Sequence, residues 1–146
     1  SASKSHHFLG VNENGMASIV NTTGNPDGHV VLRGGSTGPN FESQHVNRIS
    51  SELRDFNLPH KVMIDCSHGN SNKDYRRQAE VLKNVANQIS NGEKNILGVM
   101  LESHLKEGNQ KLLKREDLEF GRSITDACID IETTKDLLAI LYDSVL

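Results

Sequence analysis

Short runs of apolar residues alternate with amphipathic stretches along most of this sequence. Three of the runs lie within residues 29–35, 61–70 and 95–104, and each ends in polar or glycine residues. Apolar runs of this length without alternation are typical of strands that are buried on both faces, as in parallel sheets. We therefore predict a parallel strand in each of the three segments.

Amphipathic stretches separate these strands. After the first strand, apolar residues recur every three or four positions, at Val46, Ile49, Leu53 and Phe56. The same spacing follows the second strand, at Tyr75, Ala79, Leu82, Val85 and Ile89. This spacing is typical of helices that bury one side, and Gly92 can end the second helix in a left-handed conformation.

A last helix is predicted to start near Thr133. A threonine is a suitable N-cap because its hydroxyl can accept a hydrogen bond from an amide of the first turn. One side of this helix carries apolar residues, namely Leu137, Leu138, Leu141 and Val145.

Two strand-like runs, residues 6–12 and 17–23, open the chain. Asn14-Gly15 lies between them, and both residue types tolerate positive φ, which tight hairpin turns require. The pattern therefore predicts a β-hairpin before the first parallel strand.

The order of the predicted elements indicates an α/β fold. Successive strand-helix-strand units form parallel sheets with right-handed crossovers. Three parallel strands alone leave unpaired backbone groups at both edges of their sheet. We therefore expect the sheet to be part of a larger one.

Polar residues follow the three predicted strands at a nearly constant interval. Arg33 and His68 are 35 residues apart, and His68 and Glu102 are 34 apart. Each of the three residues therefore occupies an equivalent position at the carboxyl end of its own strand. In a parallel sheet these ends lie on one rim, which is where barrel enzymes build active sites. Asp126, on the loop after the third strand, could reach the same rim. Polar residues also follow strands for no functional reason, because loops are commonly polar.

The chemistry of these residues favours a divalent transition metal and an anion. His68, Glu102 and Asp126 offer an imidazole and two carboxylates, which suit Mn, Fe, Co or Zn, although a lone histidine is often only structural. Arg33 precedes Gly34-Gly35, where a guanidinium and close backbone amides could hold an anion; a flexible turn is the alternative.

Two other groups of residues receive a structural interpretation. We interpret the cations Lys73, Arg76 and Arg77 as the solvated first turn of a helix. Cys66 and Cys128 form no CxxC motif, and we expect them to be thiols that pack as small apolar residues.

Composition limits the class of protein. The chain has 146 residues, of which 35% are hydrophobic, and a net charge of −3. No segment has the roughly 20 apolar residues of a membrane span, and SASKSHHFLG does not resemble a signal peptide. The acidic balance argues against general nucleic-acid binding. We therefore expect a cytoplasmic protein that binds neither membrane nor nucleic acid.

Four segments carry a resemblance to a known family. VVLRGG, MIDCSHGNSNKDYRRQ, GVMLESHLKEGNQ and SITDACI, in this order and spacing, resemble the class I alpha type of 3-deoxy-D-arabino-heptulosonate-7-phosphate (DAHP) synthase. The resemblance covers essentially the whole chain, and HHFLGVNENGMASIVNTTGNPDGH resembles the extra hairpin of the microbial feedback-regulated branch. One departure is Asp130-Ile131-Glu132, where many relatives have a small residue and tryptophan.

The resemblance implies the C-terminal portion of a TIM (β/α)8 barrel. Residues 1–28 would be a regulatory β-hairpin, and residues 29–146 the last three strands with their helices. His68, Glu102 and Asp126 resemble three of the four ligands of the family's divalent metal. Arg33 resembles a residue that binds the phosphate of phosphoenolpyruvate. Catalytic roles are thereby implied for Arg33, His68 and Asp126, while a cysteine ligand and several substrate-binding cations belong to the strands that are absent.

The implied activity is the condensation of phosphoenolpyruvate with erythrose 4-phosphate, the first step of the shikimate pathway. The resemblance also implies a homo-oligomer that is feedback-inhibited by an aromatic amino acid bound near Phe8, Gly10 and Val20. Tyrosine is favoured, because phenylalanine-sensitive members carry serine where Gly10 stands, and glycine leaves room for a hydroxyl; ordinary hairpin packing is the alternative.

Three interpretations of the chain compete, and the first is the condensing enzyme itself, of which this chain is the C-terminal part. With five strands absent, we expect the 146 residues alone to be inactive. The chain could be a non-catalytic piece that folds by self-association or with its missing N-terminal half. A related barrel that condenses phosphoenolpyruvate with another sugar phosphate is a third interpretation, which the GNSNKD and ITDAC motifs disfavour.

Overall fold

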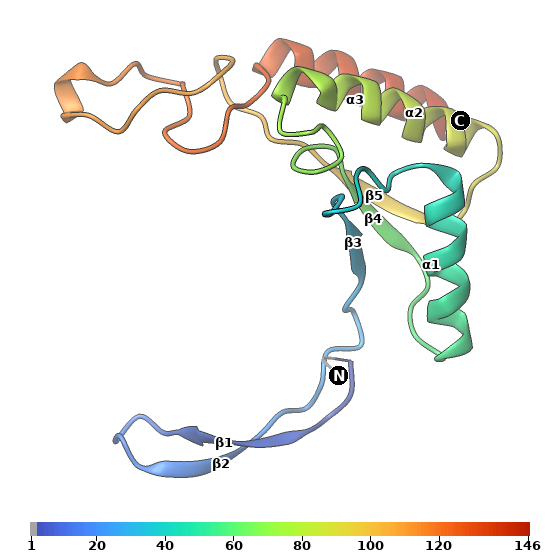
Figure 1. The fold of residues 1–146 in the computed structure, drawn as a ribbon, viewed down its shortest axis with the longest axis vertical. Helices are drawn as coiled ribbons and strands as arrows, with labels where there is room; N and C mark the ends of the chain where they lie inside the picture. The colour runs from blue at the N-terminus through green and yellow to red at the C-terminus, as the bar shows by residue number, and fades with distance from the viewer. Residues whose placement is uncertain (1–2) are drawn as a thin grey trace.

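A computed structural model describes residues 3–146 (Figure 1). A hairpin is followed by strands and helices in alternation and by a long irregular segment before the last helix. The elements are β1 (His7–Val11), β2 (Ala17–Asn21), β3 (Val30–Leu32), α1 (Ser43–Asp55), β4 (Val62–Asp65), η1 (Tyr75–Arg77), α2 (Gln78–Ser90), β5 (Ile96–Met100), η2 (Arg115–Asp117) and α3 (Ile131–Ser144).

The three predicted buried strands form one parallel sheet in the order β3-β4-β5. In this register Leu32 lies beside Ile64, and Ile64 lies beside Val99. Side chains in line across neighbouring strands share a face of the sheet. The prediction of an α/β fold with a parallel sheet is therefore confirmed.

One face of the sheet packs against the helices and forms the core. Ile64 and Val62 from β4 are fully buried there. They pack in one cluster with Val46 of α1 and with Leu82 and Val85 of α2. These helix residues are among those whose spacing predicted the helices, so periodicity identified the buried sides of α1 and α2.

The opposite face of the sheet is open. It carries Val31, Met63 and Met100, which alternate along the strands with the residues of the core face. Val31 and Met100 are 37% and 43% exposed. Figure 1 shows the helices gathered on one side of the sheet, while the hairpin and the irregular segment project from the other. The sheet thus has an apolar face that no described part of this chain covers.

The ends of the helices differ in detail from the predictions. A 3-10 turn, η1, contains Tyr75, so α2 begins only at Gln78. The prediction that Thr133 caps the last helix is wrong. Asp130 is the N-cap of α3, because its carboxylate accepts a hydrogen bond of 2.8 Å from the Thr133 amide. Gly92, with φ of +94°, follows α2 in the left-handed conformation, as predicted.

The predicted hairpin is present as β1 and β2, with His7 opposite Asn21 and Val11 opposite Ala17. Only Gly15 of the Asn14-Gly15 pair takes a positive φ, of +75°. The Gly15 amide bonds to the Asn12 carbonyl, and the Asn12 amide bonds to the Met16 carbonyl. One left-handed glycine is enough to close a turn of this length. Ser1 and Ala2 of the predicted 1–28 segment lie outside the described residues.

Among residues 3–146, none of the helices combines the length and the apolar content that crossing a bilayer requires.

Leu82→Ala tests whether the core beneath β4 stabilises the chain. Leu82 is fully buried, so the substitution should lower the free energy of unfolding by about 2–5 kcal/mol in urea denaturation. Leu138→Ala on α3 is the matched control, because Leu138 is 50% exposed and its loss should cost only about 0.5 kcal/mol. Equal effects of the two substitutions would contradict this description of the core.

Candidate metal centre

A cavity of about 360 Å³ lies at the carboxyl ends of the parallel strands. Its wall contains all four residues that were predicted to lie on the rim. Four further residues that were not predicted also line it. The lining residues are Arg33, His68, Ser71, Lys73, Tyr75, Glu102, Asp126 and Ala127. The three strand ends and the loop with Asp126 therefore lie around one cavity, as predicted.

His68, Glu102 and Asp126 bring one potential ligand atom each to a common point. These three atoms all lie within 4.8 Å of one another. Nε2 of His68 is 3.4 Å from Oε1 of Glu102, and both side chains are about seven-tenths buried. An imidazole nitrogen and two carboxylate oxygens suit a divalent transition metal. Their role as ligands stays a prediction.

His68 owes its position to a tight loop that follows β4. Its φ is +46°, and those of Asn72 and Lys73 are +54° and +63°. Such left-handed residues are uncommon outside glycine and often mark functional sites. The loop closes on itself, because the Lys73 amide donates to the His68 carbonyl at 2.8 Å. This turn directs the His68 side chain toward the cavity instead of along the strand.

Arg33 is fixed by contact between its own loop and the His68 loop. A Cβ on Gly34 would lie 2.5 Å from the backbone of Gly69, so the two chains can approach only because both residues are glycine. Asn70 is buried and links the loops: its amide group donates to the Leu32 carbonyl at 3.0 Å, and its side-chain oxygen accepts from the Asn40 amide at 2.8 Å. Arg33 and His68 are thereby held on adjacent loops.

Glu102 is held through its backbone by Gln78, the first residue of α2. Gln78 is fully buried. Its side-chain oxygen accepts from the Glu102 amide at 2.7 Å, and its side-chain nitrogen donates to the Glu102 carbonyl at 3.1 Å. Both backbone groups beyond the end of β5 are therefore satisfied, and the helix and the strand end are locked together.

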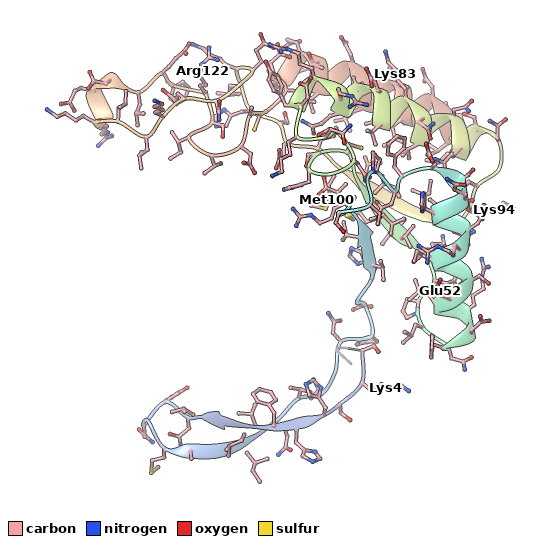
Figure 2. The ribbon with its side chains drawn as sticks, in the orientation of Figure 1. Lys4, Glu52, Lys83, Lys94, Met100 and Arg122 are labelled. Atoms are coloured by element: carbon pink, nitrogen blue, oxygen red, sulfur yellow. The ribbon has the colours of Figure 1, made fainter. Side chains whose placement is uncertain are left out.

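Asp126 comes from the long segment between β5 and α3, which we call the arm (residues 104–127). Figure 2 shows Arg122 in this arm, well away from Glu52 and Lys94 around α1. The arm returns to the site because the Gly108 amide donates to the Cys128 carbonyl at 2.8 Å, and the Cys128 amide donates back at 3.1 Å. Asp126 lies just before this pairing.

The arm is held internally by an ion-pair network. Glu119 accepts hydrogen bonds from Arg122 and Lys106, the latter at 2.8 Å. The hydrogen bond from Arg122, followed by that from Lys106, lowers the pKa of Glu119 to about 2. Lys106 and Glu119 are about half exposed and Arg122 is 30% exposed, so the network orders the arm rather than the core.

Negative charge is concentrated in the cavity. Burial raises the pKa of Glu102, and the nearby carboxylates of Asp126 and Asp65 raise it further, while His68 and Arg33 lower it. Clustered carboxylates of this kind disfavour each other's ionised form. A bound cation would relieve that repulsion, so the electrostatics agree with the donor set.

The structure revises the interpretation of the basic residues after His68. Lys73 is exposed, as that interpretation expected, but it lies in a turn before η1 rather than in a helix, and it lines the cavity with Arg33. Its left-handed backbone turns it away from the helix, and no sequence periodicity signals that. Arg77 does lie at the surface, paired with Glu80, and Arg76 covers the ring of Tyr75.

The two cysteines are free and buried. Cys66 is fully buried, and burial together with the neighbouring Asp65 raises the pKa of its thiol to about 12. It is part of the core cluster, as its interpretation as a small apolar residue predicted. Burial also raises the pKa of Cys128.

Comparison with known proteins finds one family and several relatives. The model of the DAHP synthetase I family matches residues 1–139. A tyrosine-inhibited phospho-2-dehydro-3-deoxyheptonate aldolase from Schizosaccharomyces pombe is 46% identical over 96% of this chain. A Phe-sensitive one from Escherichia coli K12 is 50% identical over 96%. A solved structure of such an aldolase from Francisella tularensis SCHU S4 superposes with a TM-score of 0.89 at 45% identity over 99% of this chain.

The chain is shorter than these relatives. It spans 39% of the S. pombe protein, 40% of the E. coli protein and 42% of the F. tularensis chain. The activity named for the relatives therefore belongs to longer polypeptides.

Acidification should loosen the arm. The pKa of Glu119 is lower in the folded chain than its ordinary 4.5, so its ion pairs contribute fully above about pH 4.5 and are lost as the pH falls toward 2. Backbone amide NMR of residues 104–127 should show this loss of order. Glu119→Gln should loosen the arm already at neutral pH, whereas the control Glu116→Gln, on η2 of the same arm, should not. An unchanged acid profile in Glu119→Gln would contradict the prediction.

Proposed function

The chain belongs to the DAHP synthetase I family, and from this premise we propose that its cavity serves the condensation of phosphoenolpyruvate with erythrose 4-phosphate. The products would be DAHP and inorganic phosphate. The convergence of His68, Glu102 and Asp126 with two cations in one cavity is the observation that carries this proposal. The name of the relatives, phospho-2-dehydro-3-deoxyheptonate aldolase, describes the same chemistry.

His68, Glu102 and Asp126 would hold a divalent metal ion. The fit rests on the donor set and on the raised pKa of Glu102, which comes first from burial and then from the carboxylates of Asp126 and Asp65. A metal bound there supplies a Lewis acid that polarises a carbonyl oxygen and orients the substrate. Mn, Fe, Co and Zn all accept such ligands. Catalytic roles follow for His68 and Asp126 as parts of this centre.

Arg33 would bind the phosphate of phosphoenolpyruvate, and Lys73 would supply a second positive charge. Both line the cavity on the side of the His68 loop. The two substrates are anions that repel each other, so cations that neutralise them make their approach less costly. A guanidinium can bind phosphate through two hydrogen bonds at once, which suits Arg33 to fix its orientation.

The reaction forms one carbon-carbon bond and replaces the C2–O bond to phosphate with a C2–O bond to the oxygen of water. C3 of phosphoenolpyruvate attacks the aldehyde carbon of erythrose 4-phosphate, whose oxygen takes a proton. Water adds to C2, and the C2–O bond to phosphate then breaks to leave the ketone. The chain's own part is to bring the two carbons into contact and to balance the charge of the departing phosphate, tasks for which Arg33 and Lys73 are placed.

We infer further that residues 29–146 form the last three strands and helices of a TIM (β/α)8 barrel. Two features support this: β3 and β5 have free edges in the sheet, and Val31, Met63 and Met100 form an uncovered apolar face. In a closed barrel such a face lies in the packed interior. The competing proposal is a catalytically inactive chain in which self-association covers these surfaces.

The hairpin (residues 1–28 in the predicted division) would carry the inhibitor site. Phe8 and Val20 are paired across β1 and β2, and Gly10 lies on the same face. A Cβ on Gly10 would lie 2.9 Å from a methyl group of Val20. A serine there would therefore narrow the space beside Val20. This supports tyrosine, whose hydroxyl needs room, as the feedback inhibitor.

Phosphate release tests the catalytic proposal. With Mn²⁺ present, the chain alone should release no phosphate from phosphoenolpyruvate when erythrose 4-phosphate is added, because five barrel strands are absent in this interpretation. Adding the N-terminal strands of a close relative as a separate polypeptide should restore release, and His68→Ala should abolish it again.

The control for this assay is Arg77→Ala, which changes a cation outside the cavity and should leave the restored rate unchanged. Release by the chain alone that depends on His68 would show the incomplete-barrel inference to be wrong. No release after complementation would argue against the catalytic proposal itself.

Inhibitor preference tests the hairpin proposal. In the complemented enzyme, tyrosine should inhibit phosphate release at lower concentration than phenylalanine, and Gly10→Ser should shift the preference toward phenylalanine. Leu9→Ser is the matched control, because Leu9 is next to Gly10 but lies on the other face of the hairpin. Much tighter binding of phenylalanine than of tyrosine in a calorimetric titration would show that tyrosine is not the preferred inhibitor.

A further inference from the structure

Asp65 is a buried acid next to the candidate metal centre that the proposed reaction has not used. It is the last residue of β4 and is only 2% exposed. Within residues 3–146 its one ion pair is with His68, and neither lysine nor arginine balances it. Burying a carboxylate costs free energy unless its oxygens are fully engaged. The placement of Asp65 therefore needs an explanation in terms of its partners.

Both oxygens of Asp65 are engaged by two residues that follow it closely, Ser67 and His68. Oδ1 accepts from the Ser67 amide at 2.9 Å and from the Ser67 hydroxyl at 2.6 Å. Oδ2 lies 2.8 Å from Nδ1 of His68. The same ring nitrogen lies 2.7 Å from the Ser67 hydroxyl oxygen. Asp65, Ser67 and His68 thus form one closed hydrogen-bonded group.

The donors and acceptors of this group determine where the His68 proton lies. The Ser67 hydroxyl uses its hydrogen toward Asp65, and an ionised carboxylate only accepts. Nδ1 must therefore be the donor and carry the hydrogen. In a neutral ring Nε2 is then unprotonated, and Nε2 is the atom that faces Glu102 at 3.4 Å.

We propose that Asp65 is a positioning residue that holds His68 in the Nδ1–H tautomer, so that Nε2 presents its lone pair to a divalent metal. The metal part of this inference rests on the proposed function; the tautomer part rests only on the hydrogen bonds. A carboxylate behind a ligating histidine fixes the orientation of the ring and makes the ligand more basic.

A purely structural role for the Asp65 side chain does not explain its contacts as well. Its side-chain bonds reach only Ser67 and His68, so it joins no two separate elements. The strand end is secured by backbone groups instead: Asn70 donates to the Asp65 carbonyl, and the Cys66 amide donates to Met100. What the carboxylate adds is control of the imidazole.

The first test is the protonation pattern of His68 in the metal-free chain. Nitrogen-15 NMR of the imidazole in alkaline buffer should show a protonated Nδ1 and an unprotonated Nε2, with His68→Gln used to assign the signals. A protonated Nε2 in the unmodified chain would overturn the inference. This measurement needs neither metal nor a variant of Asp65.

The second test compares the affinity for Mn²⁺ alone, by titration calorimetry, in the unmodified chain and in Asp65→Asn. An amide of the same shape can donate to Nδ1 and thereby favour the wrong tautomer. Asp65→Asn should shift the proton to Nε2 and weaken Mn²⁺ binding about 10–100-fold. Ser67→Ala is the control, since it keeps the Asp65–His68 contact and should retain most of the affinity.

The outcomes separate this inference from the proposed function. If Asp65→Asn changes neither the tautomer nor the Mn²⁺ affinity, Asp65 does not position His68. If the unmodified chain shows the expected tautomer but binds no Mn²⁺, the proposed metal centre fails while the control of the tautomer by Asp65 stands. Circular dichroism of each variant identifies any loss of affinity that comes from unfolding.

Discussion

Hydrogen bonding between the parallel strands β3, β4 and β5 is the constraint on which the candidate site depends. Parallel pairing forces the carboxyl ends of neighbouring strands to the same edge of the sheet. Arg33, His68 and Glu102 each follow one of these strands, so they meet although they are far apart in sequence. The core of α1 and α2 beneath β4 holds this edge in place.

The site is then refined by groups that satisfy the backbone beyond the strand ends. Gln78 binds both backbone groups of Glu102, and Asn70 joins the loops that follow β3 and β4. Gly34 and Gly69 allow those loops to touch. Such buried polar contacts are costly when incomplete and rigid when complete. A ligand set made of loop residues can therefore keep the geometry that metal binding needs.

Negative and positive side chains occupy different parts of the cavity. Glu102, Asp126 and Asp65 gather negative charge around His68, while Arg33 and Lys73 bring positive charge to the wall. A site of this kind is suited to take up a cation at its centre and anions at its margin. That division agrees with the reaction proposed above, in which a metal assists the joining of two phosphorylated substrates.

The sequence by itself determined the type and order of the elements, the buried sides of α1 and α2, and the rim on which four chemical groups would meet. Apolar periodicity and the regular interval between strand ends contain that information, because burial and strand pairing follow them directly. The tertiary structure alone decided that Lys73 faces the cavity, that Gln78 holds Glu102, that Asp65 supports His68 and that Asp130 caps α3. These contacts depend on left-handed backbone turns and on the exact approach of elements that are distant in sequence. Neither leaves a periodic signal, because each is set by the direction of one side chain after the sheet has formed.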